Sequence, residues 1–307
     1  MSERPLLALV GPTASGKTEA GLALAVGLDA EVVSIDSMLV YRGMDVGTAK
    51  PTPGERARVR HHMVDVVEPS ESFSVAHFQR EARAATQGTA ARGHSCLLVG
   101  GSGLYFRAIV DELEFPGTDP GTRVDLERQA DVLGAARMYE RLTALDPVAA
   151  GKIEPGNVRR TVRALEVAAI TGRPFSSFAA AWERYPAERV RAVGIRMPRT
   201  CLMARIGLRV DAMLEARWID EVRTLVERGL GGWLTSSQAI GYAELARHLR
   251  GEMTVEEVVE VTVKRTGALA RRQIAWFRRD PRVRWFDVGE TGAIEAADAI
   301  RAYLEDA

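Results

Sequence analysis

Short apolar runs alternate with amphipathic segments along the first third of the chain. The runs cover residues 6–10, 31–36 and 95–99, and residues 19–26 and about 75–92 between them have the composition and spacing of helices. Runs of this length match buried strands better than buried helices. Strands that alternate with helices form a parallel sheet that carries helices on both faces. The pattern therefore predicts an α/β fold.

The middle of the chain has a different pattern. From about residue 111 to residue 188 helix-forming residues dominate, no strand-like run occurs, and prolines punctuate the segment at positions 116, 120, 147, 155 and 174. Residues 189–197 then alternate as one more strand. We therefore predict an all-helical insertion domain, residues 111–188, within an α/β core formed by residues 1–110 and 189–307.

From residue 200 onward the sequence predicts helices throughout. Trp218 begins an apolar stripe that continues at Val222, Leu225 and Val226, the spacing of one buried helix face. In the run from about 255 to 279, basic residues recur every seven positions on a single face: Lys264, Arg271 and Arg278, and Arg265, Arg272 and Arg279. Such a face fits the phosphate backbone of a nucleic acid. A solvated helix face is the alternative.

A complete phosphate-binding loop lies between the first strand and the first helix. It reads Gly11-Pro12-Thr13-Ala14-Ser15-Gly16-Lys17-Thr18. In such loops the backbone N–H groups and the positive end of the following helix bind phosphate groups. Lys17 adds a charge for the outer phosphates, and the Thr18 hydroxyl is a ligand for Mg²⁺. The residues from Gly11 to Thr18 are thus the predicted diphosphate or nucleotide site, with an ordinary glycine-rich turn as the alternative.

Asp36 stands at the end of the second predicted strand. Because ligands of parallel α/β sheets bind at the carboxyl ends of the strands, we expect Asp36 and the phosphate loop to face one crevice. The alternative is that Asp36 only caps the next segment. The third strand runs into Gly100-Gly101-Ser102-Gly103, where the missing side chains allow a ligand or another backbone to approach closely.

Composition narrows the class of protein. The 307 residues are 46% hydrophobic and 27% charged, with a formal net charge of zero, and the N-terminus lacks a signal-peptide pattern. We expect a cytoplasmic protein without membrane spans. Only four of the 41 basic residues are lysines, and arginine suits bidentate phosphate contacts. Neither Cys96 nor Cys201 has a second Cys or a His at the spacing of a metal site, and the pair His61-His62 lacks a third ligand. We therefore expect neither a disulfide nor a zinc site.

The phosphate loop leaves three functions open. The first is a small-molecule or nucleoside kinase, although no strand other than the one before Asp36 ends in a convincing magnesium-binding carboxylate. In the second, the loop holds pyrophosphate as a leaving group while a carbon is transferred to a nucleic-acid nucleophile. The third is a nucleotide-dependent switch that binds RNA.

Six blocks of the sequence resemble the bacterial tRNA dimethylallyltransferases, or IPP transferases, in order and approximate spacing. They comprise residues 11–18, 36–41, 61–65, 99–105, 160–166 and 272–277, so the resemblance extends over nearly the whole chain. It implies a core like that of the P-loop nucleoside triphosphatases (NTPases). It also implies transfer of a dimethylallyl group from dimethylallyl diphosphate to N6 of the adenosine at position 37 of tRNA, releasing diphosphate.

The resemblance also implies roles for individual residues. The phosphate loop would hold the diphosphate with Mg²⁺, Asp36 would be the general base, and Arg209 would bind the diphosphate, so that Thr13, Asp36 and Arg209 are the predicted catalytic residues. The helical insertion would bind the anticodon stem-loop, and the working unit would be a monomer. The predicted tRNA contacts are Asp36, Ser37, Met38, Leu39, Ser102, Arg123, Arg159, Arg160, Thr161, Val162, Arg163, Arg272 and Gln273.

The chain departs from the family pattern in a few places. Ser102 replaces a usual Thr, Arg217 replaces a usual Gly, and Gly241-Tyr242-Ala243-Glu244 replaces Gly-Tyr-Arg-Gln, which removes one expected tRNA contact. No Cys/His zinc-finger pattern follows the core, as expected of the short bacterial form. Adenylate isopentenyltransferases share the loop and the donor but act on free nucleotides, and the helical insertion and basic helix face favour tRNA.

Overall fold

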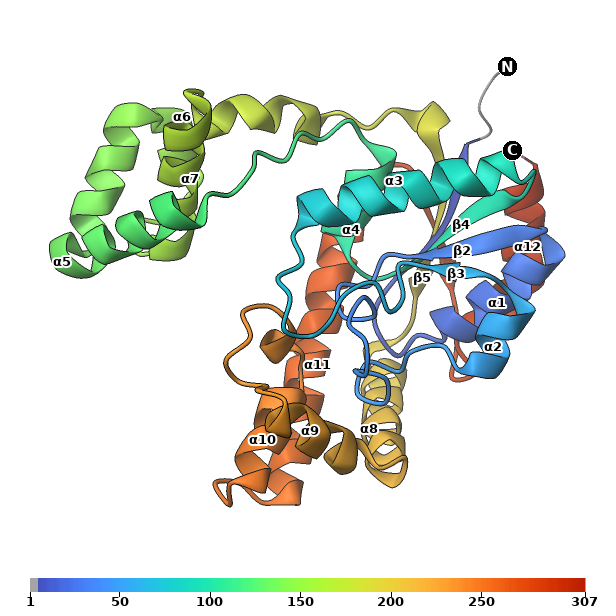
Figure 1. The fold of residues 1–307 in the computed structure, drawn as a ribbon. Helices are drawn as coiled ribbons and strands as arrows, with labels where there is room; N and C mark the ends of the chain where they lie inside the picture. Colours follow the sequence, from blue (N-terminus) through green and yellow to red (C-terminus); the bar gives the residue numbers. More distant parts are fainter. Residues whose placement is uncertain (1–4, 307) are drawn as a thin grey trace. The chain divides into compact units, whose positions relative to one another are not determined.

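The computed structural model describes residues 5–306 (Figure 1). The chain forms two compact units, one up to Val110 and again from Pro186 onward, the other from Asp111 to Tyr185. The second boundary thus lies at residue 185, where the sequence pattern suggested 188.

The first unit is built on a six-stranded sheet in which every pairing is parallel. The strand order is β3-β2-β4-β1-β5-β6. The bounds are β1 Leu6–Val10, β2 Ala30–Ser34, β3 His61–His62, β4 Ser95–Gly100, β5 Val190–Arg196 and β6 Val283–Asp287. The apolar β1 lies between β4 and β5, with Ala8 opposite Leu98 and Ala192. The predicted parallel α/β sheet is confirmed.

Helices cover both faces of this sheet. Helix α1 (Lys17–Gly27) joins β1 to β2, whereas α3 (Val75–Ala91) joins β3 to β4 and crosses the sheet in the opposite direction. Because parallel crossovers are right-handed, opposite directions bring the two helices to opposite faces, as Figure 1 shows. Helix α12 (Ala297–Glu305) packs on α1, and α4 (Gly103–Val110) packs on α3.

The prediction that the chain is helical throughout after residue 200 is wrong, because β6 pairs with β5 at one edge of the sheet. Two of its five residues, Arg284 and Asp287, are exposed. An edge strand this short and this charged has no local pattern that separates it from a loop, and it exists because β5 offers it hydrogen-bond partners. The two-residue β3 and the short helix α2 (Pro53–Arg58) were also not predicted, for the same reason of length.

The rest of the C-terminal part is helical. It contains α8 (Arg199–Glu215), α9 (Trp218–Glu227), α10 (Tyr242–Leu249) and α11 (Val255–Phe277), with short 3-10 turns at Ala187–Arg189, Ser236–Gln238 and Ala293–Ala296. Trp218, Val222 and Leu225 are at most 1% exposed, which confirms the predicted buried stripe at these positions, whereas Val226, the fourth predicted member, is half-buried. No helix in the described part of the chain is long and apolar enough to cross a membrane.

The second unit contains only helices among its described residues. They are α5 (Pro120–Leu145), α6 (Pro147–Ala150), α7 (Val158–Thr171) and a 3-10 helix at Phe175–Glu183. Gly134 interrupts α5 with non-helical backbone angles, φ 81° and ψ 162°. Met138, Leu142 and Leu165 form the centre of a separate hydrophobic core. The predicted all-helical insertion is confirmed, and its core lets the unit fold around its own apolar contacts.

Candidate active site

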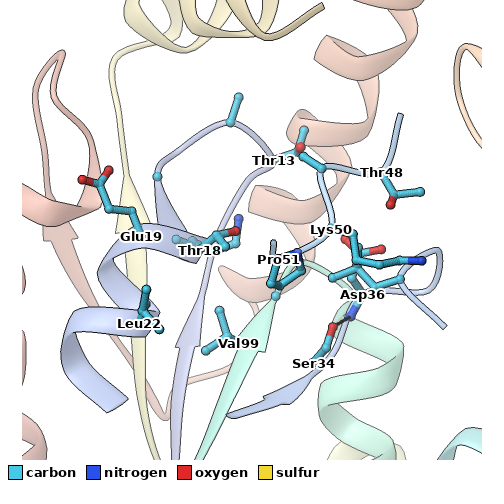
Figure 2. Close-up of a pocket in the computed structure, with 18 of the residues that line it drawn as sticks. Thr13, Thr18, Glu19, Leu22, Ser34, Asp36, Thr48, Lys50, Pro51 and Val99 are labelled. Atoms are coloured by element: carbon cyan, nitrogen blue, oxygen red, sulfur yellow. Dashed lines mark hydrogen bonds between the residues drawn. The ribbon is translucent and has the colours of Figure 1, made fainter. Parts of the chain in front are cut away.

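A cavity of about 600 Å³ opens at the carboxyl ends of the strands (Figure 2). Thr13, Gly16, Lys17 and Thr18 line it from the phosphate loop after β1, and Asp36 lines it from the segment after β2. Gly100 and Gly101 contribute from the end of β4, between those two strands. The structure thus brings Asp36 and the phosphate loop to one cavity, as the crevice rule for parallel sheets predicts.

The phosphate loop has the backbone of an anion site. Ala14 and Gly16 have positive φ angles of 63° and 82°, and Gly16 is the N-cap of α1. The Ser15 hydroxyl donates to the carbonyl oxygen of Pro12 at 2.9 Å, and the Lys17 ammonium donates to the same oxygen. These bonds curl the loop over the N-terminus of α1, where N–H groups and the helix dipole favour a phosphate group.

Two segments far along the chain hold the outer side of this loop. Arg205 of α8 donates from Nε to the Ala14 carbonyl at 2.8 Å and from Nη1 to the Glu290 carbonyl at 2.7 Å. The Ala293 N–H donates to the Ser15 carbonyl at 2.9 Å. Arg205 is not among the predicted site residues. Its only signal was its position one helical turn before Arg209.

Gln273 of α11 holds the inner side of the loop. The Thr13 N–H donates to Gln273 Oε1 at 2.8 Å. A Cβ atom on Gly101 would lie 2.2 Å from Gln273 Nε2, so only glycine at 101 lets the amide reach the loop. Gln273 is one of the predicted tRNA contacts, whereas in the structure its carbonyl oxygen accepts a hydrogen bond from the phosphate loop. The glycines after β4 do permit the close approach that was predicted.

Lys17 and Arg209 bring two positive charges to the cavity. The pKa of Lys17 is lowered to about 7, mainly by burial and also by the nearby Arg209, while Asp36 acts in the opposite direction. Burial also lowers the pKa of Arg209, again opposed by Asp36. Since burial disfavours both charges, and Arg209 also disfavours that of Lys17, an anion that enters the cavity would stabilise both and bind tightly.

Asp36 is half-buried where the chain leaves β2. Its Oδ1 accepts the N–H of Met38 at 2.9 Å, which fixes the turn through Ser37 to Leu39. Beside it, the Ser102 N–H donates to the Ile35 carbonyl at 3.1 Å, and Ser102 Oγ accepts the Tyr105 N–H at 3.3 Å. The predicted tRNA contacts Ser37, Met38, Leu39 and Ser102 therefore lie around Asp36, all partly exposed.

The predicted tRNA contacts of the second unit divide into two groups. Arg159 and Arg160 are exposed at the start of α7, but Thr161 and Val162 are only 1% and 3% exposed. Arg123 and Arg163 donate to the buried Glu166 carboxylate at 2.6 Å and 2.8 Å. Burial would raise the pKa of Glu166, but these two arginines outweigh it and hold the pKa below its usual value. Arg123 and Arg163 therefore stabilise the unit, and among these predicted contacts Arg159 and Arg160 are the arginines without an ion pair in the described part of the chain.

The basic face predicted on the C-terminal helix lies on α11. Helix α11 ends at Phe277, so Arg278 and Arg279 occupy the turn that follows rather than the helix. All six basic side chains are exposed. Arg265 pairs with Glu244, one of the residues that departs from the family pattern, whereas the others form no ion pair within residues 5–306: Lys264, Arg271, Arg272, Arg278 and Arg279.

Thr18 is the candidate magnesium ligand, exposed at the start of α1 and lining the cavity. Nowhere in residues 5–306 do three or more His, Cys, Asp or Glu side chains form a metal site of their own. Mg²⁺ bound to phosphates takes only one or two protein oxygens and keeps several waters, so one hydroxyl beside a phosphate loop fits this ion. His61 and His62 bind the Val59 carbonyl and the Glu31 carboxylate instead.

Comparison with known proteins gives a consistent result. The model of the family described as IPP transferase matches residues 39–280. A tRNA dimethylallyltransferase of Kineococcus radiotolerans is 51% identical over 307 aligned positions, covering 98% of this chain and 96% of the relative. The crystal structure of a full-length tRNA isopentenylpyrophosphate transferase from Bacillus halodurans superposes with a TM-score of 0.70 at 39% identity, covering 99% of this chain and 98% of that one. A eukaryotic dimethylallyltransferase acting on tRNA shares the fold, with a TM-score of 0.82 at 24% identity over 98% of this chain and 78% of that one.

Proposed function

This chain belongs to the IPP transferase family of tRNA-modifying prenyltransferases, and we propose that it transfers a dimethylallyl group from dimethylallyl diphosphate to N6 of adenosine 37 in the anticodon stem-loop of tRNA. One observation carries the proposal: a phosphate loop, two half-buried cations and the Asp36 carboxylate line a single cavity. The cavity thus offers an anion site for the donor and a base for the acceptor.

Departure of the diphosphate is the first chemical requirement. When the allylic C–O bond breaks, negative charge develops on the leaving oxygen, and Lys17, Arg209 and the N–H groups of the phosphate loop are suited to neutralise it. Donors fixed in advance within a partly buried site stabilise such charge more than mobile water does. Bonds from Gln273 and Arg205 support this role because they hold the loop in place before substrate arrives.

Activation of the amine is the second requirement. The exocyclic amino group of adenine is a poor nucleophile because its lone pair is delocalised into the ring. We propose that Asp36 accepts a proton from N6 as N6 bonds to the allylic carbon, a role typically worth ~10²–10⁴ in rate. The adenosine must leave its stack in the loop to reach the cavity, as base-modifying enzymes require.

Mg²⁺ is the proposed cofactor, and Thr18 the residue that would hold it together with the diphosphate. The ion would supply positive charge for the leaving group. The residues of the chain itself bind, orient and deprotonate the substrates. Thr13 is one of the residues that would contact the donor, because its N–H donates to Gln273 and its side chain faces the cavity (Figure 2).

Two basic regions are the proposed tRNA contacts. Arg159 and Arg160 of α7 and the basic face of α11 offer exposed positive charge to the phosphate backbone.

A single chain suffices for the cavity, which supports a monomer as the working unit. Both cysteines are free, and burial raises the pKa of Cys96 to about 12, features that accord with the reducing cytoplasm as its compartment.

Incubation with radiolabelled dimethylallyl diphosphate, Mg²⁺ and either unmodified tRNA or free AMP tests the proposal, followed by nucleoside analysis. We expect label in tRNA as N6-(dimethylallyl)adenosine and none in AMP. Label in AMP would instead identify an adenylate isopentenyltransferase. Phosphoryl transfer from ATP to a small molecule, with no prenyl transfer, would identify a kinase.

A further inference from the structure

The segment Met44–Pro51, which we term the wall loop, forms part of the cavity lining. Thr48, Ala49, Lys50 and Pro51 contact the cavity. Arg209 reaches this loop, where its Nη2 donates to the Thr48 carbonyl at 3.2 Å. The wall loop therefore supplies a hydrogen-bond acceptor for the Arg209 guanidinium.

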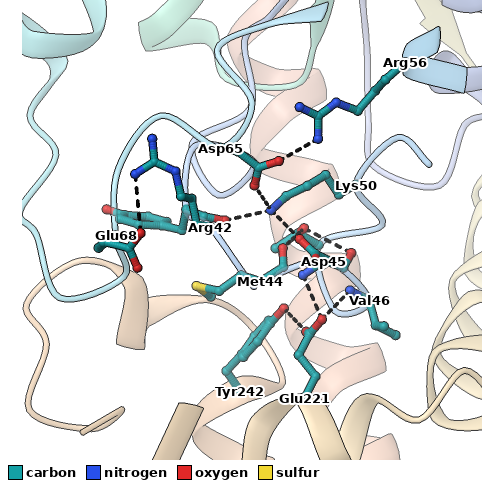
Figure 3. Close-up of polar contacts among 12 residues, drawn as sticks. Arg42, Met44, Asp45, Val46, Lys50, Arg56, Asp65, Glu68, Glu221 and Tyr242 are labelled. Atoms are coloured by element: carbon teal, nitrogen blue, oxygen red, sulfur yellow. Dashed lines mark hydrogen bonds and ion pairs between the residues drawn. The ribbon is translucent and has the colours of Figure 1, made fainter. Parts of the chain in front are cut away.

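Glu221 of α9 binds the start of the wall loop (Figure 3). Its carboxylate accepts three successive N–H groups, those of Asp45, Val46 and Gly47, at 2.8, 2.7 and 3.3 Å. The hydroxyl of the buried Tyr242 donates to the same carboxylate at 2.7 Å. Hydrogen bonds to an ionised acceptor are about twice as strong as neutral ones, so this carboxylate strongly favours one conformation of the loop.

Packing holds the same part of the loop. A Cβ atom on Gly47 would lie 2.1 Å from Trp218 Nε1 and 2.6 Å from Tyr242 Cε2. The Gly47 backbone therefore rests directly on two large side chains, both at most 1% exposed. Their rings meet edge to face with centroids 5.7 Å apart. No local pattern in the sequence indicates this packing, because the partners of Gly47 lie on α9 and α10.

Lys50 closes the other end of the loop. Its ammonium donates to the Tyr41 carbonyl at 2.7 Å and to the Asp45 and Asp65 carboxylates at 2.5 and 2.7 Å, and its side chain is 4% exposed. Arg56 also donates to Asp65, at 2.6 Å. Burial would raise the pKa of Asp65, but the bonds from Lys50 and Arg56 keep it below its usual value. With all three donors committed, Lys50 braces the loop and is not a phosphate ligand.

We propose that Glu221 is a positioning residue for Arg209. Glu221 fixes the wall loop, the loop fixes the Thr48 carbonyl, and that carbonyl orients the guanidinium toward the anion site. An arginine side chain is flexible, and ordering it before the ligand binds removes part of the entropic cost of binding. The inference rests on the proposed function only in identifying the anion as a diphosphate.

Binding of pyrophosphate with Mg²⁺, measured by isothermal titration calorimetry, tests this role. In Glu221→Gln the side chain keeps its shape but loses its charge and one acceptor, and we expect the affinity for pyrophosphate to fall about tenfold. Glu227→Gln is the matched control. Glu227 is exposed on the same helix without a hydrogen-bond or ion-pair partner among the described residues, so we expect no change.

A double-mutant cycle separates positioning from general support of the fold. If Glu221 acts through Arg209, Glu221→Gln in an Arg209→Ala background should change the affinity for pyrophosphate less than twofold. An equal loss in both backgrounds, or no loss in either, would overturn the proposal. The affinity for tRNA should stay the same in Glu221→Gln.

Tyr242→Phe provides a second route if Glu221→Gln fails to fold. It removes one hydrogen bond to Glu221 and leaves the ring packing intact, so we expect a loss of about twofold to threefold in the affinity for pyrophosphate, again absent without Arg209. Persistence of that loss in the Arg209→Ala background would contradict the role. If the wild-type protein bound no pyrophosphate, the proposed donor site itself would be refuted. If the wild-type protein bound pyrophosphate and these substitutions left the affinity unchanged, only the role of Glu221 would be refuted.

Discussion

The basic residues of the cavity and those of α11 differ in their hydrogen bonds to the rest of the protein. The cavity holds Lys17 and Arg209, whereas Lys264, Arg271 and Arg278 lie on α11 and in the turn after it. Lys17 donates to the Pro12 carbonyl and Arg209 to the Thr48 carbonyl, and burial lowers the pKa of both. The other three are exposed and form no ion pair within the described residues. One set is ordered before any ligand binds, and the other is free to follow a ligand.

This difference assigns the two sets to different physical tasks. Partly buried charges interact strongly over short distances and are little screened by salt. Exposed charges attract a polyanion over longer distances, and salt weakens them. We therefore expect changes in the cavity to alter donor binding and chemistry, and changes on α11 to alter tRNA affinity and its dependence on salt.

The largest effect is expected from Asp36→Asn. Asparagine keeps an oxygen that can accept the Met38 N–H but cannot take a proton from an amine. Prenyl transfer should fall by ~10²–10⁴, and tRNA affinity should stay within a few-fold. Single-turnover transfer and filter binding measure the two quantities. Full activity in this variant would end the assignment of Asp36 as general base.

Replacement of Lys264, Arg271 and Arg278 by alanine comes next. tRNA affinity should fall on the order of tenfold to a hundredfold, and the slope of log affinity against log salt should decrease by about three, because each phosphate contact contributes about one. Affinity measured across a salt series gives the slope. Alanine at Arg58, Arg80 and Arg301, exposed elsewhere in the same unit, is the control. An unchanged slope would make the α11 face an ordinary solvated surface.

The pH dependence of pyrophosphate binding should reveal Lys17. Its pKa of about 7 means that raising the pH through neutrality removes its charge, whereas a bound anion favours the charged form. Binding should therefore take up protons, and affinity should weaken about tenfold between pH 6 and pH 8. Lys17→Arg is the control, because arginine stays charged over this pH range. Any pH dependence that remains in this variant comes from the titration of pyrophosphate itself. Equal proton uptake by both proteins, measured calorimetrically in two buffers, would contradict this expectation.

Gln273→Met should have a smaller effect than these three and decides between two roles for one residue. Methionine fills similar space but cannot accept the Thr13 N–H. If Gln273 holds the phosphate loop, pyrophosphate affinity should fall about threefold to tenfold without tRNA present. If it serves only as a tRNA contact, pyrophosphate affinity will stay constant and tRNA affinity will fall.

Features encoded over a few neighbouring residues could be predicted from the sequence. The phosphate loop, the strand before it and the helix after it follow from backbone preferences at Gly11 and Gly16 and from hydrophobic spacing. The position of Asp36 could be predicted because the apolar run at residues 31–36 marks where the second strand ends. The stripe from Trp218 to Leu225 was equally local, and so was the helical character of the insertion.

The tertiary structure decided which side chains act on which segments. Gln273 and Thr13 are 260 positions apart, and no local pattern links an amide on α11 to the phosphate loop. Glu221 and Lys50 carried no recognisable signal for the same reason, and the spacing of Arg205 from Arg209 did not reveal its contact with the phosphate loop. Strand β6 depends on the edge that β5 provides. Backbone conformation depends on near neighbours, whereas the partner of a buried polar group is set by whichever segment the fold brings within hydrogen-bond distance.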